Sequence, residues 1–407
     1  MSFFYSDIKS EIEIDYNELV LDINKIDNYS LYLISTNYYD IFKTIILSLI
    51  NDSELILLDY DFSENEINNL LGDKVNLKKK IHLQKPKFNN FSEIISLIKN
   101  SNNWRLSLFT SGTTGLPKQI KHTFNSLTRN CKTSNKHHNN IWGYAYNPTH
   151  MAGIQVFFQA ILNQNSIIRL FNLNQAQIFD SIQKYQITNI SATPSFFRLF
   201  SFDKTKLDSV RRLTLGGEKF DVNLKDKLKN LFPNSKLLNV YASTEAGSIF
   251  ASDGEIFTIN KNYLNYIKIV DNEIYLHKEI LGEGTENKLL RNWYPTGDIV
   301  DVIEISPLKF KFSSRKNEMI NVGGYKVNPN EIEEILLTID GVKDVIVFGK
   351  QNSVLGNIIC TNIAVDKQLE VPTIRAYLSK YLQNYKIPRI ITFVDKIEKT
   401  RTGKKKR

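Results

Sequence analysis

Short apolar strand patterns alternate with helical patterns along the first hundred residues, and this alternation restricts the possible folds more than any other pattern in the chain. Ser30–Thr36 reads as a short strand, Tyr39–Asn51 as a helix and Glu54–Tyr60 as a buried strand. Such an order predicts an α/β layer with parallel strands. The polar segment Leu70–Asn103 is expected to be a loosely ordered crossing before the next strand.

Four later strand patterns each run into small or polar residues. They are Leu106–Phe109, Ile187–Ala192, Arg212–Leu215 and Lys236–Tyr241. Open α/β sheets bind ligands in the crevice beyond the carboxyl ends of their strands. The residues that follow these strands are therefore the first candidates for a functional site.

The pattern changes after the last of these strands. Gly254–Ile305 favours short antiparallel strands, and a second unit begins near Asn317. In that unit a helix at Asn330–Ile339 precedes two strands, a further helix, a last strand and a basic tail. About 90 residues can form a small domain of their own. We therefore expect an α/β chain with a large N-terminal domain, residues 1–316, and a small α+β C-terminal domain, residues 317–407.

The composition limits the class of protein. The chain has 407 residues, of which 42% are apolar and 23% charged, a mixture typical of a globular enzyme. Its two cysteines, Cys131 and Cys360, form no CxxC pair, which argues against a disulfide framework or a cysteine zinc site. No apolar run approaches the ~20 residues of a membrane span, and acidic residues stand where a signal peptide has its apolar core. We therefore predict a cytoplasmic protein without a membrane span.

The formal net charge of +9 raises the question of nucleic-acid binding. However, six of the basic residues lie within Lys399–Arg407. The sequence also has no zinc-finger spacing, no aromatic RNA-binding signature and no basic helix with interleaved aromatic residues. A polyanionic small substrate explains the excess charge equally well. We expect no nucleic-acid partner, and binding through the basic tail remains a weaker alternative.

A loop rich in glycine and hydroxyl groups follows the strand Leu106–Phe109. Its residues are Thr110, Ser111, Gly112, Thr113, Thr114, Gly115, Leu116, Pro117 and Lys118. Backbone N–H and side-chain O–H groups in such a loop can surround phosphate oxygens, and the lysine adds positive charge. The loop is not a Walker A motif, because no Gly-Lys-Ser/Thr closes it. Taken alone, it could equally be a surface turn.

Further motifs follow this loop in a fixed order. They are Gly216-Gly217-Glu218; Tyr241-Ala242-Ser243-Thr244-Glu245; Tyr294-Pro295-Thr296-Gly297-Asp298; Arg315 with Gly323-Gly324-Tyr325-Lys326-Val327 and Glu331-Ile332-Glu333; and Lys399-Thr400-Arg401-Thr402-Gly403-Lys404. In this order and spacing the set resembles the adenylate-forming (AMP-binding) superfamily, which includes luciferases and peptide-synthetase adenylation domains. Within it, the chain most resembles acyl-CoA and aryl-CoA synthetases. The resemblance runs from about residue 31 to the C-terminus and is specific from Trp104 onward.

The resemblance implies how the nucleotide would be held. The Thr110–Lys118 loop would contact the β- and γ-phosphates of ATP. Tyr241 would lie against the adenine ring, with Asn239 and the turn Gly216–Glu218 nearby. Asp298 would accept hydrogen bonds from both ribose hydroxyls, as carboxylates do in other nucleotide sites. Arg315 would assist it.

The resemblance also implies catalytic roles. Thr244 would hydrogen-bond the α-phosphate, and Glu245 would hold Mg²⁺, a hard cation that prefers carboxylate oxygen. Lys404 would bridge the substrate carboxylate and the α-phosphate as charge builds up during transfer. Each residue alone has an ordinary alternative, such as a turn carboxylate or a surface cation. Their joint order favours the functional reading.

The implied reaction has two steps. A carboxylate attacks the α-phosphorus of ATP, pyrophosphate leaves, and an acyl-adenylate stays bound, a reaction that depends on positioning and charge stabilisation. In the family the C-terminal domain then rotates about a hinge, which would be Asn317 here, and an acceptor thiol takes the acyl group. The implied partners are ATP, Mg²⁺, a small carboxylic acid and CoA. A carrier-protein pantetheine or an amine is the alternative acceptor.

His150 stands where amino-acid-activating relatives place an aspartate. The stretch Asn147–Gly153 instead resembles acyl- and aryl-CoA ligases, in which an aromatic or histidine side chain closes the carboxylate pocket. His150 is therefore a catalytic candidate, and the alternative is a core histidine with satisfied hydrogen bonds. Thr193–Ser195 and Ala242-Ser243 would line the acyl pocket.

Several positions depart from the family pattern. Ala242 and Ser314 stand where glycine is usual, and Asn317 where aspartate or lysine is commoner. The N-terminal domain is also short. None of these changes removes a nucleotide ligand. A non-catalytic homologue that keeps the AMP-binding fold is the alternative from another functional class.

Overall fold

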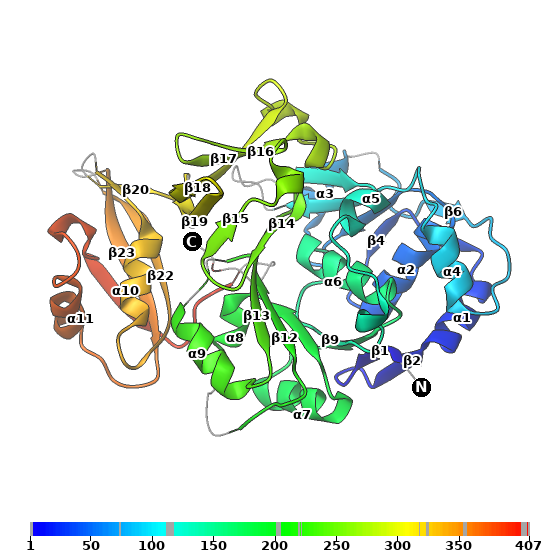
Figure 1. Cartoon of the computed structure of the whole chain (residues 1–407), viewed down its shortest axis with the longest axis horizontal. Helices are drawn as coiled ribbons and strands as arrows, with labels where there is room; N and C mark the ends of the chain where they lie inside the picture. The colour runs from blue at the N-terminus through cyan, green and yellow to red at the C-terminus, as the bar shows by residue number, and fades with distance from the viewer. Residues whose placement is uncertain are drawn as a thin grey trace.

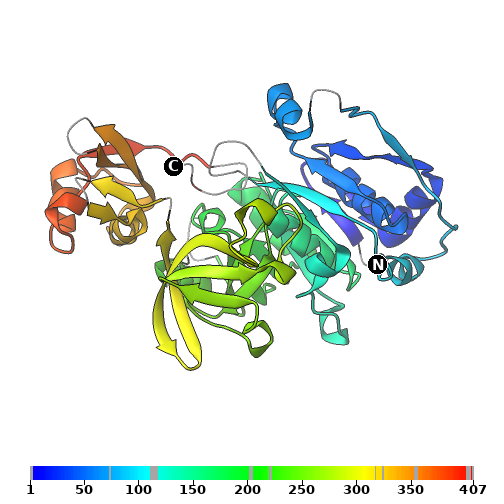
Figure 2. The ribbon, with the colours of Figure 1, turned by 90° about the horizontal axis from the view of Figure 1, so that it is seen from above.

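The computed structural model describes residues 3–72, 75–110, 118–200, 205–218, 220, 222–316, 318–322, 325–352, 356–399 and 405. Parallel sheets form the N-terminal and central parts, and an antiparallel sheet follows. A small C-terminal unit with its own sheet lies at the end of the molecule opposite the N-terminal part (Figures 1 and 2). None of the helices within these ranges combines the length and apolar character that crossing a membrane requires.

The first parallel sheet carries the strand that leads into the Gly/Ser/Thr loop. Its order is β4 (Tyr32–Ile34), β5 (Leu55–Leu58), β7 (Leu106–Thr110) and β8 (Lys118–His122). β4, β5 and β7 run parallel, as the alternating pattern predicted, and β8 runs antiparallel to β7. Almost every residue of helix α2 (Tyr38–Ile50) is buried against this part of the core. The loop residues Thr110 and Lys118 therefore stand opposite each other on paired strands.

The segment Leu70–Asn103 is more regular than the sequence predicted. It contains the end of helix α3 (Glu64–Leu71), strand β6 (Lys80–His82), which pairs with β3 (Asn28–Ser30), and helix α4 (Phe91–Ile98). The buried face of α4 consists of Phe91, Ile94, Ile95 and Ile98. This spacing of i, i+3, i+4 and i+7 is that of an amphipathic helix. The prediction of a loosely ordered crossing is wrong, because polar flanks obscured a short helix.

The central sheet has the strand order β14-β13-β12-β11-β9-β10-β1-β2. The strands are β1 (Phe3–Asp7), β2 (Ile12–Asp15), β9 (Ile141–Tyr144), β10 (Ser166–Arg169), β11 (Asn189–Ala192), β12 (Arg212–Gly216), β13 (Lys236–Ser243) and β14 (Gly247–Ser252). Strands β13 to β1 in this order are parallel, and the outer strands β14 and β2 are antiparallel to their neighbours. β1, which the sequence did not predict, extends the parallel sheet beside β10.

Helices cover both faces of the central sheet, as an all-parallel core requires. The helices are α1 (Tyr16–Lys25), α5 (Phe124–Thr128), α6 (Met151–Ile161), α7 (Gln175–Tyr185), α8 (Pro194–Phe197) and α9 (Val222–Leu231). α1 and α6 share one apolar core with α2, whereas α7 and α9 belong to a second core. Because β11, β12 and β13 run parallel, their carboxyl ends lie at the same edge of the sheet.

The predicted antiparallel region forms a sheet of its own. Its order is β15 (Ile256–Thr258), β19 (Leu308–Arg315), β18 (Trp293–Ile305), β17 (Glu273–His277) and β16 (Ile267–Val270). All of its described pairings are antiparallel, which confirms the prediction for Gly254–Ile305. The long hairpin β18–β19 carries Asp298 and Arg315 on adjacent strands.

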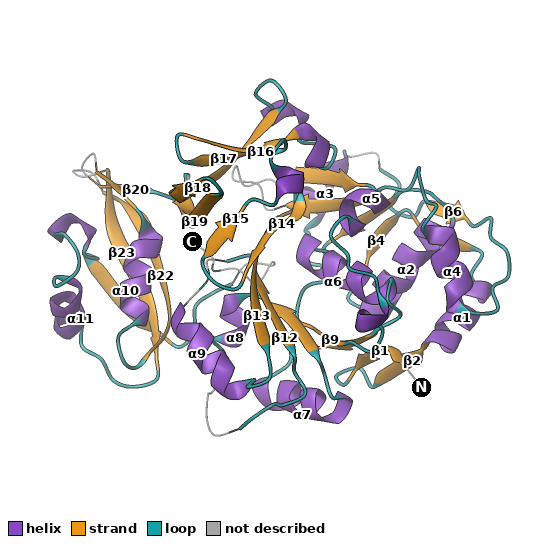
Figure 3. Ribbon diagram, viewed as in Figure 1, coloured by secondary structure: helices purple, strands orange, loops and turns teal. Residues whose placement is uncertain are grey.

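The C-terminal unit is a sheet with two helices (Figure 3). Its elements are β20 (Ile320–Val322), β21 (Tyr325–Val327), α10 (Pro329–Leu337), β22 (Val342–Asn352), β23 (Gly356–Val365), α11 (Val371–Leu378) and β24 (Ile390–Val394). A separate apolar core that includes Ile332, Val345 and Ile374 holds these elements together. The helices and strands follow the predicted order. The boundary between residues 316 and 317 stays a prediction, because Asn317 lies outside the described residues.

Candidate active site

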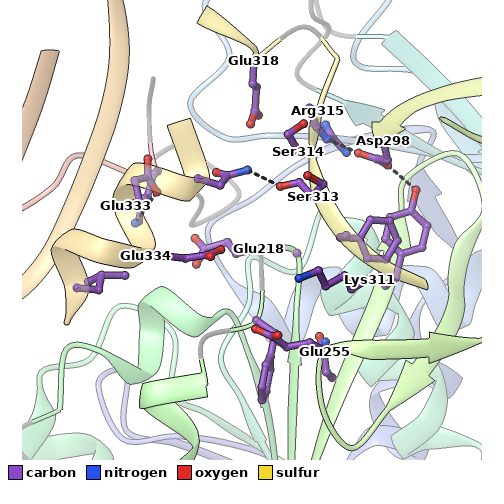
Figure 4. A pocket seen from close by; sticks show the side chains of 18 of the residues that line it. Glu218, Glu255, Asp298, Lys311, Ser313, Ser314, Arg315, Glu318, Glu333 and Glu334 are labelled. Atoms are coloured by element: carbon purple, nitrogen blue, oxygen red, sulfur yellow. Dashed lines mark hydrogen bonds and ion pairs between the residues drawn. The ribbon is translucent and has the colours of Figure 1, made fainter. Parts of the chain in front are cut away.

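A cavity of about 600 Å³ lies where the ends of β12 and β13, the hairpin β18–β19 and helix α10 face one another (Figure 4). This volume lies within the range of small-molecule sites. Six of the residues predicted to contact the nucleotide line it: Gly217, Glu218, Asn239, Tyr241, Asp298 and Arg315. The fold therefore brings together residues that are up to 98 positions apart in the sequence.

The centre of this cavity wall is the carboxylate of Asp298. Its two oxygens have different partners, since Arg315 Nε donates to Oδ1 at 2.8 Å and Tyr241 Oη donates to Oδ2 at 2.5 Å. The Asp298 residue is 5% exposed. The carboxylate raises the pKa of Arg315, so that the guanidinium stays charged. We refer to Tyr241, Asp298 and Arg315 as the nucleoside cluster.

The backbone around Asp298 explains its orientation. Gly297 has φ +75°, a left-handed conformation that favours glycine, and its N–H donates to Glu273 Oε1 at 2.9 Å. The N–H of Asp298 donates to Thr296 Oγ1 at 3.0 Å. The Thr-Gly-Asp motif is thus held within strand β18, and the pairing of β18 with β19 places Asp298 opposite Arg315.

Aromatic packing fixes the ring of Tyr241. Phe312 stacks on it with ring centroids 4.4 Å apart and an interplanar angle of 19°, and Phe250 lies at a tilt with centroids 5.5 Å apart. Burial, followed by the neighbouring Asp298, raises the pKa of Tyr241 well above its ordinary value, so that the hydroxyl keeps its proton. Phe312 leaves at most one face of the tyrosine for a nucleobase. The sequence did not single out Phe312, which lies in an ordinary strand pattern.

Glu218 and Asn239 also have protein partners. Glu218 Oε2 accepts hydrogen bonds from Ser195 N at 3.0 Å and Ser195 Oγ at 2.8 Å. Asn239 Nδ2 donates to Gly254 O at 2.8 Å. Gly217, with φ +82°, forms the turn after β12, and Gly216 is the buried last residue of that strand. These contacts hold the strand ends that form the floor of the cavity.

Lys118, Thr244 and Glu245, which are predicted for the phosphates and the metal, are not among the residues that line this cavity. Glu245 Oε1 accepts a hydrogen bond from Tyr294 Oη at 3.1 Å. Lys288, at the end of the short 3-10 helix Glu286–Lys288, has its Nζ 5.8 Å from the Tyr294 ring centroid. Burial and then the ammonium of Lys118 lower the pKa of Lys288, and Glu245 opposes this shift. Lys118, Lys288, Glu245 and Tyr294 form what we call the phosphate-side cluster.

Lys288 is a candidate that the sequence analysis missed. It belongs to no motif and lies in a polar stretch, so only its spatial proximity to Lys118 and Glu245 reveals it. No group of three or more His, Cys, Asp or Glu side chains that could hold a metal ion occurs within the described ranges. A Mg²⁺ ion at Glu245 would therefore take its other ligands from phosphate oxygens and water, the usual coordination of this ion.

His150 lies in a polar network outside the cavity lining. Its Nε2 is 3.1 Å from Asp59 Oδ2, and Asp59 Oδ1 accepts hydrogen bonds from Asn147 Nδ2 at 2.9 Å and from the hydroxyl of Thr149. Burial by itself would raise the pKa of Asp59. The contacts with His150, Thr149 and Asn147 outweigh burial and lower it. Asp59 is another residue that the sequence analysis did not single out.

Some predicted residues lie outside the described residues. They are Ser111, Gly112, Thr113, Thr114, Gly115 and Lys404. Residues near Lys404 are described: Lys399 Nζ donates to Ser195 O at 2.9 Å, and Lys405 Nζ lies 3.2 Å from both Glu333 Oε2 and Asp344 Oδ1. The tail thus contacts the central part of the chain before Lys404 and the C-terminal unit after it. The roles of all these site residues stay predictions.

Two family models match the chain. Residues 59–279 match the model of AMP-binding enzymes, and residues 331–404 match that of the AMP-binding enzyme C-terminal domain. A 2-succinylbenzoate–CoA ligase of Staphylococcus epidermidis is 26% identical over 326 residues, which cover 74% of this chain and 68% of the ligase. Bacitracin synthase 3 of Bacillus licheniformis is 23% identical over 340 residues, which cover 73% of this chain but only 5% of the synthase.

Solved structures show the same fold. The o-succinylbenzoate CoA synthetase (MenE) of Bacillus subtilis, in complex with the acyl-adenylate intermediate OSB-AMP, has a TM-score of 0.67 at 17% identity. ATP-bound MatB of Rhodopseudomonas palustris has a TM-score of 0.74 at 16% identity. Each match covers 99% of this chain and 94% of the other. These neighbours confirm the predicted fold class, a large N-terminal part of layered sheets and helices followed by a small C-terminal unit.

Proposed function

The chain belongs to the AMP-binding enzyme family, and from this premise we propose that it activates a carboxylic acid as an acyl-adenylate and then transfers the acyl group to a thiol. The observation that carries the proposal is the nucleoside cluster, in which Tyr241 and Arg315 hold Asp298 at the wall of a cavity of nucleotide size. CoA is the acceptor that we favour, because several of the relatives are CoA ligases. A cytoplasmic location is part of the same proposal.

The nucleoside cluster would bind a ribose through the remaining hydrogen-bonding positions of Asp298. Each carboxylate oxygen has capacity for two hydrogen bonds. Arg315 and Tyr241 use one position on Oδ1 and one on Oδ2. One position therefore remains on each oxygen, which suits the two neighbouring hydroxyls of a ribose. The part of Tyr241 that lines the cavity would then meet the adenine.

The phosphate-side cluster would act on the triphosphate. The substrate carboxylate oxygen forms a bond to the α-phosphorus while the bond from that phosphorus to the bridging oxygen of pyrophosphate breaks, and the electron pair leaves with pyrophosphate. Lys118 and Lys288 would neutralise the negative charge that grows on the leaving group. A Mg²⁺ ion held by Glu245, when bound, supplies further charge neutralisation at the phosphate oxygens. Thr244 would donate to the α-phosphate.

The thioester step needs an acyl-adenylate that stays bound until a thiol arrives. The thiol sulfur forms a bond to the acyl carbonyl carbon and releases its proton to solvent, while the bond from that carbon to the phosphate oxygen breaks and AMP leaves with the electron pair. The nucleoside cluster would hold the adenylate through this exchange. Lys404 would serve in the first step, and His150 would close the carboxylate pocket, with Asp59 orienting its ring.

Pyrophosphate release tests the proposal. The protein is incubated with ATP, Mg²⁺ and a panel of carboxylic acids that includes 2-succinylbenzoate, with and without CoA, and products are identified by mass spectrometry. We expect acid-dependent release and an acyl-CoA product. Glu245→Gln should slow release by about a hundredfold, the order of magnitude lost with one charge-stabilising group. Glu279→Gln, which changes an exposed glutamate outside the proposed site, is the matched control.

Other outcomes separate the alternatives. Pyrophosphate release with no CoA adduct would point to a carrier-protein pantetheine or an amine as acceptor. ATP binding without release for any acid would support a non-catalytic homologue and contradict the proposed reaction. In that case Lys404→Ala would leave ATP binding unchanged.

A further inference from the structure

His122 is a buried imidazole that contacts the backbone of the Tyr241–Glu245 motif. The residue is 2% exposed, and its Nε2 lies 2.7 Å from the carbonyl oxygen of Thr244. A carbonyl oxygen only accepts hydrogen bonds, so Nε2 must carry the proton. Nδ1 lies 3.3 Å from Ser126 Oγ. Burial lowers the pKa of His122 to about 4, which agrees with a neutral ring that has its proton on Nε2.

The strand that carries His122 also carries Lys118, the last residue of the Thr110–Lys118 loop. β8 begins at Lys118 and ends at His122. Alternate residues of a strand point to the same face, so Lys118, Ile120 and His122 share one side of β8. The hydrogen bond to Thr244 therefore joins this strand, four residues from Lys118, to the segment that supplies Thr244 and Glu245.

The loop at residues 282–283 is a third segment, and it contacts both β8 and Glu245. Gly282 N donates to Glu245 O at 2.7 Å, and Lys121 and Glu283 exchange two backbone hydrogen bonds of 2.9 Å each. A Cβ added to Gly282 would lie 2.7 Å from His122 Cε1, closer than real Cβ contacts allow. The loop at 282–283 thus fits between β8 and Glu245 without spare room, and the imidazole fills the remaining space.

We propose that His122 is a positioning residue, whose N–H to the Thr244 carbonyl fixes Thr244 and Glu245 relative to Lys118 so that all three act on one triphosphate. The inference rests on the proposed function of this site. A shift of about 1 Å in such an arrangement can reduce a rate by about a hundredfold, even when the altered residue never touches the substrate. A histidine that only filled the core would need the space but not the N–H.

Two substitutions separate the hydrogen bond from the packing. His122→Gln keeps an N–H donor on a side chain of similar reach, whereas His122→Leu fills the space without a donor. In acid-dependent pyrophosphate release, we expect His122→Leu to lower kcat between tenfold and a hundredfold (~10–100). His122→Gln should retain kcat to within about threefold, and AMP affinity should stay unchanged in both. His82→Leu, an exposed histidine on β6, is the control for the same chemical change.

The proposal is overturned if His122→Leu keeps the kcat of the unaltered protein, or if His122→Gln loses as much kcat as His122→Leu. If the unaltered protein releases no pyrophosphate with any acid, the proposed function fails. The affinities for Mg²⁺–ATP and for AMP, measured by calorimetry, then test the role of His122. His122→Leu should weaken Mg²⁺–ATP binding at least fivefold relative to AMP binding, with His122→Gln restoring the ratio. An unchanged ratio contradicts the proposal whether or not the reaction occurs.

Discussion

The nucleoside cluster and the phosphate-side cluster handle charge in opposite ways. In the first, Asp298 is buried and both of its oxygens already accept hydrogen bonds from Tyr241 and Arg315. In the second, two lysines lie near one glutamate. Burial is the larger cause of the lowered pKa of Lys288, and the neighbouring charge of Lys118 is the next. In the first cluster, protein side chains alone balance the charge of the carboxylate, whereas the second cluster has an excess of positive charge.

This difference indicates which part of a nucleotide each cluster is built for. A neutral nucleoside gains most from hydrogen-bonding groups that are held in place before it arrives, because little conformational freedom is then lost on binding. Pyrophosphate and triphosphate are strongly anionic, and they gain from nearby cations whose mutual repulsion they relieve. The comparison therefore predicts that the nucleoside site is preorganised. It also predicts that the phosphate site, whose cations repel one another, is stabilised when an anionic ligand binds.

Removing the Asp298 carboxylate should have the largest effect. Asp298→Ala leaves the Tyr241 hydroxyl without its partner, and it removes the partner of the Arg315 guanidinium, whose side chain is 42% exposed. Leaving such groups unsatisfied costs about 2 kcal/mol in unfolding free energy, because water compensates part of the loss at Arg315. We expect that loss in chemical denaturation, together with at least a hundredfold (~100) weaker AMP binding in calorimetry.

Asp301→Ala is the control for this change, because Asp301 is exposed on the same strand β18. It should leave both the unfolding free energy and AMP affinity unchanged. Equal AMP affinity in Asp298→Ala and the unaltered protein would contradict the assignment of this cluster to the nucleoside.

Ligand addition should distinguish the two clusters by their response to salt. Pyrophosphate at about 100 times its Kd should stabilise the protein by about 2.7 kcal/mol. Higher ionic strength should weaken this stabilisation, because ions screen the attraction between exposed charges. Adenosine should stabilise the protein with little salt dependence. Thermal unfolding at low and high salt measures both, and identical salt responses for the two ligands would remove the basis of the comparison.

Lys288 alone should contribute less to ATP binding than the whole phosphate-side cluster does. Lys288→Ala removes one of the two lysines of the phosphate-side cluster, so we expect about tenfold weaker ATP binding, about 1.4 kcal/mol, with AMP binding unchanged. Calorimetry with both nucleotides provides the measurement. Lys278→Ala, at an exposed position ten residues earlier, should alter neither affinity. A parallel loss of AMP affinity in Lys288→Ala would place the lysine at the nucleoside rather than the phosphates.

The two clusters were not equally predictable from the sequence. Asp298, Arg315 and Tyr241 stand in motifs whose order is characteristic of the family, and the cross-strand pairing of Asp298 with Arg315 brings them together as expected. Lys288, His122 and Asp59 lie in no motif. Their proximity to site residues arises from tertiary contacts between segments far apart in the chain, which a local pattern does not encode.

The fold shows the same division. Strands bounded by small and polar residues, such as β5, β7 and β12, were predicted to within a few residues. Helix α4 was missed because Lys- and Asn-rich flanks masked eight residues of amphipathic pattern. Strand β1 was missed because its place beside β10 depends on a partner more than 150 residues away. The local alternation of strand and helix patterns reveals strands that belong to a repeated α/β unit. It does not reveal a strand such as β1, which is recognised only from its pairing with a distant strand.

The smallest effect should come from the hydroxyl of Tyr241, and it tests how complete the nucleoside cluster is without it. Tyr241→Phe keeps the ring that stacks on Phe312 and removes only the hydrogen bond to Asp298 Oδ2. Arg315 still holds Oδ1, so the carboxylate keeps its orientation. A net loss of about 1 kcal/mol, or about fivefold in AMP affinity, is expected from one such hydrogen bond. Tyr294→Phe, which alters the phosphate-side cluster in the same chemical way, should leave AMP affinity unchanged. A loss in Tyr241→Phe as large as that in Asp298→Ala would mean that the tyrosine, rather than the arginine, positions the aspartate.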